Sequence, residues 1–187
     1  LLAADRASYG NLAQLITRGR RNAVKGRYAL SREYVATLAD GLIALWVPPG
    51  KVGSDSTFHA GPLPADAFDE KSSLTLLSTA RWVAATFPGR AWIAVELFAH
   101  AGDRAQLAHC AALARQTGLR QVAAGDVHMH VRARRALQDT VTAIRVKKPL
   151  AECGYALHPN GERHLRSRAR LAAIYPPELL AETVAIA

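Results

Sequence analysis

The sequence predicts an α/β protein built on a parallel sheet or barrel. Short apolar runs of strand length alternate with stretches whose apolar residues recur at helical spacing, up to about Arg120. The apolar runs are nearly continuous, as expected of strands buried on both faces. Polar residues with functional side chains follow two of these runs, and the carboxyl ends of parallel strands are where such folds carry their functional groups.

The first predicted elements alternate strand and helix. Ser31 is a plausible N-cap, and Asp40-Gly41 is a turn signal before the second strand. Pro48-Pro49-Gly50 then stops that strand. The predicted elements are the end of a buried strand at 1–4, an amphipathic helix at 8–21, a short helix at 31–38 and a strand at 42–47.

The remaining predicted elements continue the alternation of strand and helix, which then ends. Residues 50–72 hold glycines and prolines without periodicity, which predicts a surface loop. Gly118 is the predicted C-cap of one helix, and the alternation ends after Pro149. The predicted elements are helices at 74–86, 103–117, 132–145, 167–174 and 178–187, and strands at 91–97 and 122–124.

One stretch carries residue types that bind metals. Asp126, His128 and His130 alternate after a short apolar run, so they would point to one face if the strand continues through them. A carboxylate and neutral imidazoles suit zinc or manganese. Further ligands would have to come from elsewhere in the chain. Glu96, near the end of its own strand, is either catalytic or a salt-bridge partner.

Charge is the clearest feature of the composition. The 187 residues carry a formal net charge of +9 with an isoelectric point near 10.2. Such a balance attracts phosphate backbones, although arginine-rich codon usage would produce it too. The candidate DNA-contacting residues, which would otherwise be solvated surface, are Arg18, Arg20, Arg21, Arg132, Arg134 and Arg135.

The composition also bounds the cellular setting. No window of about 18 uninterrupted apolar residues occurs, so we expect no membrane span. Cys110 and Cys153 lack the spacing of a metal or redox motif and read as reduced thiols, so we expect a cytoplasmic protein. The chain opens without a methionine, which suggests a piece of a longer protein.

Several segments resemble motifs of one protein family. They are Leu1-Leu2-Ala3-Ala4, Tyr9-Gly10-Asn11-Leu12, Gly125-Asp126-Val127-His128, Glu152-Cys153-Gly154 and Pro176-Pro177-Glu178-Leu179-Leu180. Together they resemble the polymerase-and-histidinol-phosphatase (PHP) domain of bacterial C-family DNA polymerase alpha subunits. The resemblance covers essentially the whole chain and is to the error-prone, damage-tolerant branch.

The resemblance implies a fold and a division of the chain. Residues 1–148 would be a partial PHP-type (β/α) barrel lacking its N-terminal strands. Residues 149–187 would be a helical linker or extension toward the palm domain. Only Asp126 and His128 match metal-ligand positions of the family. The segment Trp46-Val47-Pro48, where another ligand motif would fall, contains no ligand.

The resemblance also implies a role. The full-length chain would be a DNA-directed DNA polymerase acting in translesion synthesis and repair, on primer-template DNA, with Mg²⁺ at its palm and with sliding-clamp and mutasome partners. This part would be mainly structural, without catalytic residues or a bound cofactor. Zn²⁺ or Mn²⁺ would bind only if upstream residues complete the PHP site. The alternative is a stand-alone metal-dependent PHP-type phosphoesterase that uses Asp126 and His128 to hold a metal-bound hydroxide.

Overall fold

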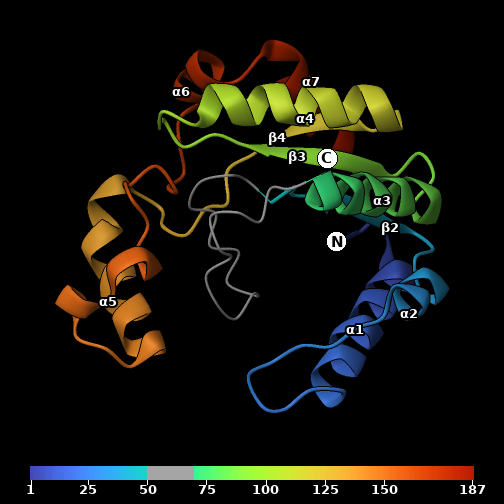
Figure 1. Ribbon diagram of the computed structural model, residues 1–187, viewed down its shortest axis with the longest axis horizontal. Coiled ribbons are helices and arrows are strands. Elements are labelled where there is room, and N and C mark those ends of the chain that lie inside the picture. The colour runs from blue at the N-terminus through green and yellow to red at the C-terminus, as the bar shows by residue number, and fades with distance from the viewer. Residues whose placement is uncertain (50–69) are drawn as a thin grey trace. The chain divides into compact units, whose positions relative to one another are not determined.

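The protein is a mixed α/β structure (Figure 1). The computed structural model describes residues 1–49 and 70–187, the side chains of 70–74 excepted. Within that part there are four strands, seven α-helices and three short 3-10 turns. They are β1 (Leu2–Ala3), α1 (Arg6–Arg21), α2 (Arg32–Thr37), β2 (Leu42–Trp46), α3 (Glu70–Thr86), β3 (Ala91–Glu96), α4 (Asp103–Thr117), β4 (Arg120–Ala124), η1 (Arg132–Arg134), α5 (Arg135–Val146), η2 (Leu150–Glu152), η3 (Gly154–Ala156), α6 (Arg168–Ile174) and α7 (Pro177–Ile186).

The strands form one four-stranded sheet in the order β1-β2-β3-β4. β2 and β3 are parallel, with Leu45 opposite Trp92, which confirms the predicted α/β class. β1 is antiparallel to β2, with Leu2 opposite Ile43, which differs from the all-parallel expectation. The predicted strand at 1–4 occurs as β1, but its predicted burial is wrong, because Leu2 at the sheet edge is 44% exposed.

The described residues fall into two compact units. The first unit comprises residues 1–48, 70–93 and 112–120, and the second comprises residues 49, 94–111 and 121–187. The first therefore contains β1, β2 and the start of β3, and the second contains the end of β3 and most of β4. The predicted boundary between residues 148 and 149 stays a prediction.

The first unit is organised around the turn that precedes β2. Helix α1 contacts β1 and β2, and its first turn is closed by a reciprocal pair in which Asp5 and Ser8 cap each other's backbone. Gly41 has φ +67°, and a Cβ there would lie 2.7 Å from the Ser8 Cβ. Glycine is therefore required at this turn for both its conformation and its closeness to α1. Leu42 follows directly and is fully buried.

Most predicted helices occur, with revised starts. Helix α2 begins after Ser31, whose hydroxyl accepts the Tyr34 backbone N–H, and α4 has its predicted bounds. Helix α3 begins at Glu70, so the loop predicted for 50–72 is wrong at its last three residues. The rest of that predicted loop lies outside the described residues. Arg132–Arg134 form a 3-10 turn, so the predicted helix at 132–145 begins three residues late.

In the second unit, α5 has an unusual distribution of polarity. Its apolar residues Leu137, Val141 and Ile144 lie at helical spacing but are 54%, 51% and 71% exposed. The opposite face carries Asp139, ion-paired to Arg135, and the buried Thr142. Elsewhere in this unit α6 packs on α7 (Figure 1). None of the helices in the described part of the chain has the length and apolar character to cross a membrane.

Candidate functional site

The candidate site lies in the second unit, after the carboxyl ends of β3 and β4. Strand β4 ends at Ala124, and Asp126 has φ +38°, which is left-handed backbone. Aspartate is among the few non-glycine residues that adopt this conformation readily. The extended segment therefore stops before Asp126, and the predicted single row of Asp126, His128 and His130 is wrong.

Asp126 and His128 nevertheless lie together. Asp126 Oδ1 is 3.2 Å from His128 Nε2, and the His128 ring packs edge-on against His158 with 4.9 Å between centroids. The second carboxylate oxygen, Oδ2, contacts the Arg163 guanidinium. His130 lines a cleft of about 520 Å³ beside His128 and α5. The predicted pair thus exists, but its carboxylate already has a cationic partner.

A later stretch of chain, residues 158–166, reaches this place and is called the return segment below. The backbone N–H groups of His128 and Met129 donate to the Arg163 carbonyl at 2.9 and 3.2 Å. The Leu165 N–H donates to the Met129 carbonyl at 3.1 Å. These bonds align the return segment with residues 128–129 in a short parallel bridge. Three backbone N–H groups and two carbonyls are satisfied in this way.

Arg163 is the centre of the return segment. It is only 4% exposed, and its guanidinium carbon lies 3.9 Å from the centroid of the Phe98 ring. A desolvated guanidinium over an aromatic face gains from the ring quadrupole, and the Asp126 carboxylate supplies the opposite charge. Phe98, two residues after β3, and Asp126, two residues after β4, are thereby joined through one cation.

Tyr175 and Arg166 join the same strand ends through hydrogen bonds. The Tyr175 hydroxyl accepts the Leu97 backbone N–H at 3.1 Å and donates to the Ala124 carbonyl at 2.6 Å. Arg166 donates to the Leu97 carbonyl at 2.8 Å and to the Tyr175 hydroxyl at 3.3 Å. Burial raises the pKa of the Tyr175 phenol, and the bond from Leu97 opposes that shift in part. The phenol therefore stays protonated and able to donate at neutral pH.

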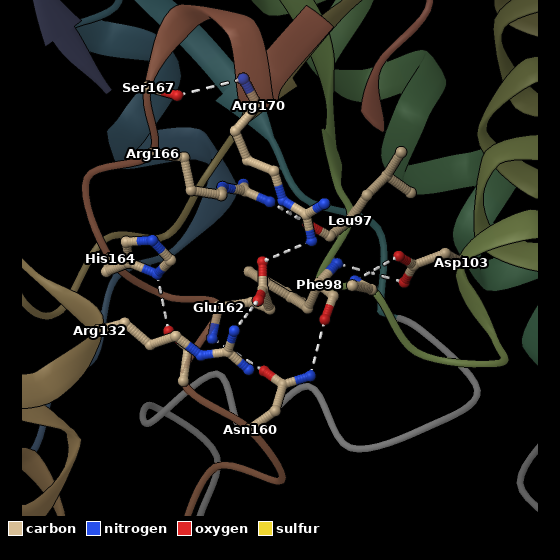
Figure 2. Close-up of polar contacts among 12 residues, drawn as sticks. Leu97, Phe98, Asp103, Arg132, Asn160, Glu162, His164, Arg166, Ser167 and Arg170 are labelled. Carbon is tan, nitrogen blue, oxygen red and sulfur yellow. Dashed lines mark hydrogen bonds and ion pairs between the residues drawn. The ribbon is translucent and has the colours of Figure 1, made fainter. Parts of the chain in front are cut away.

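Glu162 forms a third connection, shown in Figure 2. Its carboxylate is buried and lies 3.6 Å from the guanidinium of Arg132 and 3.6 Å from that of Arg170. Asn160 holds the preceding turn, donating to the Phe98 carbonyl at 2.7 Å and accepting the Glu162 N–H at 3.0 Å. The return segment thus presents a buried anion to two arginines from different elements.

The other carboxylate at the strand ends is Glu96. Burial raises its pKa, and the charges of Arg163 and His128 lower it in part. His100, four residues beyond Glu96, instead contacts Asp103, the first residue of α4, whose carboxylate accepts the backbone N–H groups of Phe98 and Ala99. Glu96 therefore lies in the same electrostatic network as Arg163, whereas His100 belongs to a helix start.

The predicted arginine clusters are divided by the structure. In the first unit, Arg18 lies over the Tyr34 ring at 5.5 Å, and with Arg21 it lines a shallow hollow of about 350 Å³. Arg20 is exposed on the same helix. In the second unit, Arg134 lines the cleft beside α5. Arg135 is committed to Asp139 and to the His158 carbonyl and is not available as a surface contact.

A metal ion does not fit the described residues well. No group of three or more His, Cys, Asp or Glu side chains that could hold an ion is found among them. Asp126 contacts a buried guanidinium, so a cation placed at its carboxylate would also face the Arg163 charge. The arrangement is suited to holding strand ends together.

The residues that dominate this site are not recognisable as functional from the sequence alone. Glu162, Arg163, Arg166 and Tyr175 were not identified as functional, although a run of arginines around one glutamate is visible at 162–170. Their partners lie up to 78 residues earlier in the chain, so no local pattern pairs them. The only local signal of these residues in the sequence is the charged cluster at 162–170, which follows the last strand.

Comparisons with known proteins give a consistent result. The chain is 47% identical over 191 residues to the error-prone DNA polymerase of Dechloromonas aromatica, 49% identical over 188 residues to that of Methylococcus capsulatus, and 48% identical over 187 residues to that of Pseudomonas aeruginosa. Each alignment covers 100% of this chain and 16% of the relative. The chain therefore spans about one sixth of the length of these relatives. No protein-family model matches it.

Proposed function

We propose that this chain is a segment of an error-prone DNA polymerase. The observation that carries the proposal is its similarity, from first residue to last, to polymerases of that name at 42–49% identity. Within such a polymerase, residues 1–148 would belong to a partial PHP-type barrel and residues 149–187 to a helical extension. The parallel β2–β3 pair and the helices between strands are consistent with that assignment.

The role proposed for the segment is mainly structural. Enzymes of parallel α/β architecture keep the carboxyl ends of their strands open to substrate. Here the chain's own return segment lies on those ends, with Arg163 over Phe98 and with Tyr175 bonded to both Leu97 and Ala124. A site filled in this way braces the fold and leaves nucleotide transfer to another part of the polymerase.

The remaining parts of the proposal concern the complete protein. Its substrates would be primer-template DNA and deoxynucleotides, and Mg²⁺ would act at its palm. Its partners would be the sliding clamp and mutasome proteins, in the cytoplasm. Arg18, Arg20, Arg21, Arg132 and Arg134 are the proposed DNA-contacting residues of the segment, while Arg135 fills a structural role.

Two steps test the proposed function. Sequencing the gene on both sides of this segment should reveal a downstream palm domain with paired aspartates. The complete product should then extend a primer past an abasic site in the template with Mg²⁺ present, and should lose this activity when those aspartates are replaced. An open reading frame that stops just after Ala187 would remove the proposal.

A second experiment tests the absence of a metal-dependent phosphoesterase. We expect elemental analysis after dialysis to find well below one Zn²⁺ or Mn²⁺ per chain, and no hydrolysis of a chromogenic phosphodiester when either ion is added. Asp126→Asn and the control His130→Gln should behave alike. Turnover that Asp126→Asn abolishes and His130→Gln preserves would restore the phosphoesterase interpretation.

A further inference from the structure

We infer that Arg132 and Arg170, held apart and oriented by the buried Glu162 carboxylate, form a phosphate-binding pair for the nucleic-acid backbone. Arg132 comes from the turn before α5 and Arg170 from α6. Figure 2 shows the Glu162 side chain between the two guanidinium groups. The inference rests on the proposed function, and it names the contact that this segment would make with DNA.

The Glu162 carboxylate is buried, whereas the two arginine side chains paired with it reach the solvent. The Glu162 side chain is 4% exposed, whereas the side chains of Arg132 and Arg170 are 68% and 49% exposed. Each arginine contacts a different carboxylate oxygen at 3.6 Å, so each keeps further N–H donors for another acceptor. Glu162 Oε2 is buried and makes no hydrogen bond within the described structure. The carboxylate therefore fixes both arginines without saturating them.

A glycine makes room for one member of the pair. A Cβ at Gly161 would lie 3.0 Å from Arg132 Cγ and 3.5 Å from its Nε. The Arg132 side chain consequently lies across the backbone at Gly161, which sets its direction before any ligand arrives. An arginine that is already oriented loses less conformational entropy on binding than one that is not.

The charge balance favours an anionic ligand. Residues 162–170 contain four arginines and one glutamate, and Arg132 adds a fifth positive charge. Arg163 and Arg166 are committed to Asp126, Phe98, Leu97 and Tyr175. Arg132 and Arg170 share one carboxylate and leave a net positive charge that faces solvent. Guanidinium groups match the geometry of phosphate oxygens and bind them in pairs.

Phosphate could be presented by a nucleic-acid backbone or by a free nucleotide, and we assign the backbone. The two guanidinium groups sit on a surface, and a surface pair suits an extended polyanion whose affinity comes from released counterions. No aromatic ring is paired with either arginine among the described contacts, so base stacking is not expected there. Binding through this pair should accordingly be independent of sequence.

The test measures binding of the 187-residue protein to a fluorescein-labelled 20-nucleotide strand at several KCl concentrations. Arg132→Gln and Arg170→Gln should each weaken binding about tenfold and lower the magnitude of the salt slope by about 1. The matched controls are Arg104→Gln and Arg115→Gln, which remove the same charge from α4. They should change the affinity by less than about twofold, because neither arginine is paired with Glu162, and a charge outside the contact acts only through the screened field.

A charge-neutral variant separates positioning from bulk charge. Gly161→Ala keeps every arginine but displaces Arg132, so it should also weaken binding, while leaving the urea midpoint close to that of the unchanged protein. Equal losses in the α4 controls and the Arg132 and Arg170 variants would overturn the inference. Full affinity in Gly161→Ala, accompanied by full affinity in either Arg132→Gln or Arg170→Gln, would also overturn it. In a parallel titration with a labelled deoxynucleoside triphosphate, a loss of affinity seen only for that nucleotide and not for the strand would overturn it as well. Primer extension by the complete gene product is scored separately, so the proposed function can stand if this contact fails.

Discussion

Arg163 determines what the neighbouring acidic residue does. Its guanidinium is almost fully buried, lies over Phe98 and contacts the Asp126 carboxylate. Transferring a charged group from water to the protein interior costs roughly several kcal/mol per ion, unless an opposite charge and hydrogen bonds offset that penalty. Asp126 is therefore best understood as the partner of Arg163, although its sequence context resembles a metal-ligand motif.

A double-mutant cycle tests this pairing. Asp126→Asn should destabilise the protein by about 1–3 kcal/mol, because the buried guanidinium loses its carboxylate. In an Arg163→Met background the same change should cost about 0.5 kcal/mol or less, since the cation has gone. Urea denaturation of the four proteins measures the coupling. Equal costs in both backgrounds would show that the two side chains are energetically independent.

Cys110 provides a prediction of pH dependence. Burial, followed by the charge of Glu96, raises the pKa of this fully buried thiol from 9.0 to about 11. The folded state therefore retains a proton that the unfolded state loses above pH 9, and unfolding becomes easier as pH rises. Between pH 9 and pH 11 this thiol should cost about 2 kcal/mol of stability, because the slope of roughly 1.4 kcal/mol per pH unit is reached only near the middle of that interval.

Cys110→Ala isolates that contribution from the other groups that titrate in alkali. The variant should be less stable at pH 7 because it leaves a small cavity. Its free energy of unfolding should nevertheless fall less steeply between pH 9 and pH 11. Parallel pH curves for the two proteins would mean that the thiol ionises as readily in the folded state as in the unfolded chain.

Among the secondary-structure elements, β3 and α5 differ most in whether their apolar residues are buried. Five of the six residues of β3 are buried, whereas Leu137, Val141 and Ile144 of α5 are exposed and its Asp139 and Thr142 side chains face inward. Both elements have the apolar content that normally indicates a core. Only β3 contributes to one here, because the inner face of α5 is occupied by the Arg135–Asp139 pair and by Thr142.

Two matched truncations should separate these elements. Ile93→Ala in β3 should cost about 2–5 kcal/mol, because the side chain is fully buried and leaves a cavity. Leu137→Ala on α5 should stay within about 0.5 kcal/mol, since its side chain is 54% exposed. The comparison uses the urea midpoints of the two variants, provided that the dependence of the unfolding free energy on urea concentration is unchanged. A large cost at Leu137 would mean that the α5 face is covered in solution.

Local signals explain which elements were predictable. Helix α4 and the Ser31 cap were predicted correctly because spacing and capping act over a few residues. The antiparallel β1 and the exposed face of α5 were not predicted, because apolar residues in sequence do not reveal which surface covers them. At the site, Asp126 and His128 lie 3.2 Å apart although no strand continues through them, and their role as metal ligands stays a prediction. The left-handed turn at Asp126 and the contact with Arg163 depend on distant parts of the chain.

At the scale of the whole chain, the return segment and Tyr175 connect residues that are far apart in sequence. The bonds from Asn160 to Phe98, from Arg166 to Leu97 and from Tyr175 to Ala124 span 62, 69 and 51 residues. All three donors lie in the part of the chain that resembles a linker, after residue 148. The stability of the second unit should therefore depend on residues outside the predicted barrel.

A shortened chain tests that dependence. Residues 1–148 lack the return segment and Tyr175, so the Leu97 and His128 amides lose their acceptors. Hydrogen exchange at these two amides should be fast in the shortened chain and protected in residues 1–187. The Leu42 amide, bonded to the Ala39 carbonyl within the first unit, is the internal control. Equal protection of the Leu97 amide in both chains would support a self-sufficient domain ending at 148.

The position of Tyr175 has a consequence for the timing of biosynthesis. Its hydroxyl accepts the Leu97 amide 78 residues earlier in the chain. At about 5–20 residues per second, a ribosome needs about 4–16 s to advance from Leu97 to Tyr175. The end of β3 is therefore made about 4–16 s before the phenol that will join it to β4, and the end of β4 is made within that interval. Codon choice between residues 97 and 175 therefore sets how long a nascent chain spends with these strand ends uncovered and within reach of chaperones.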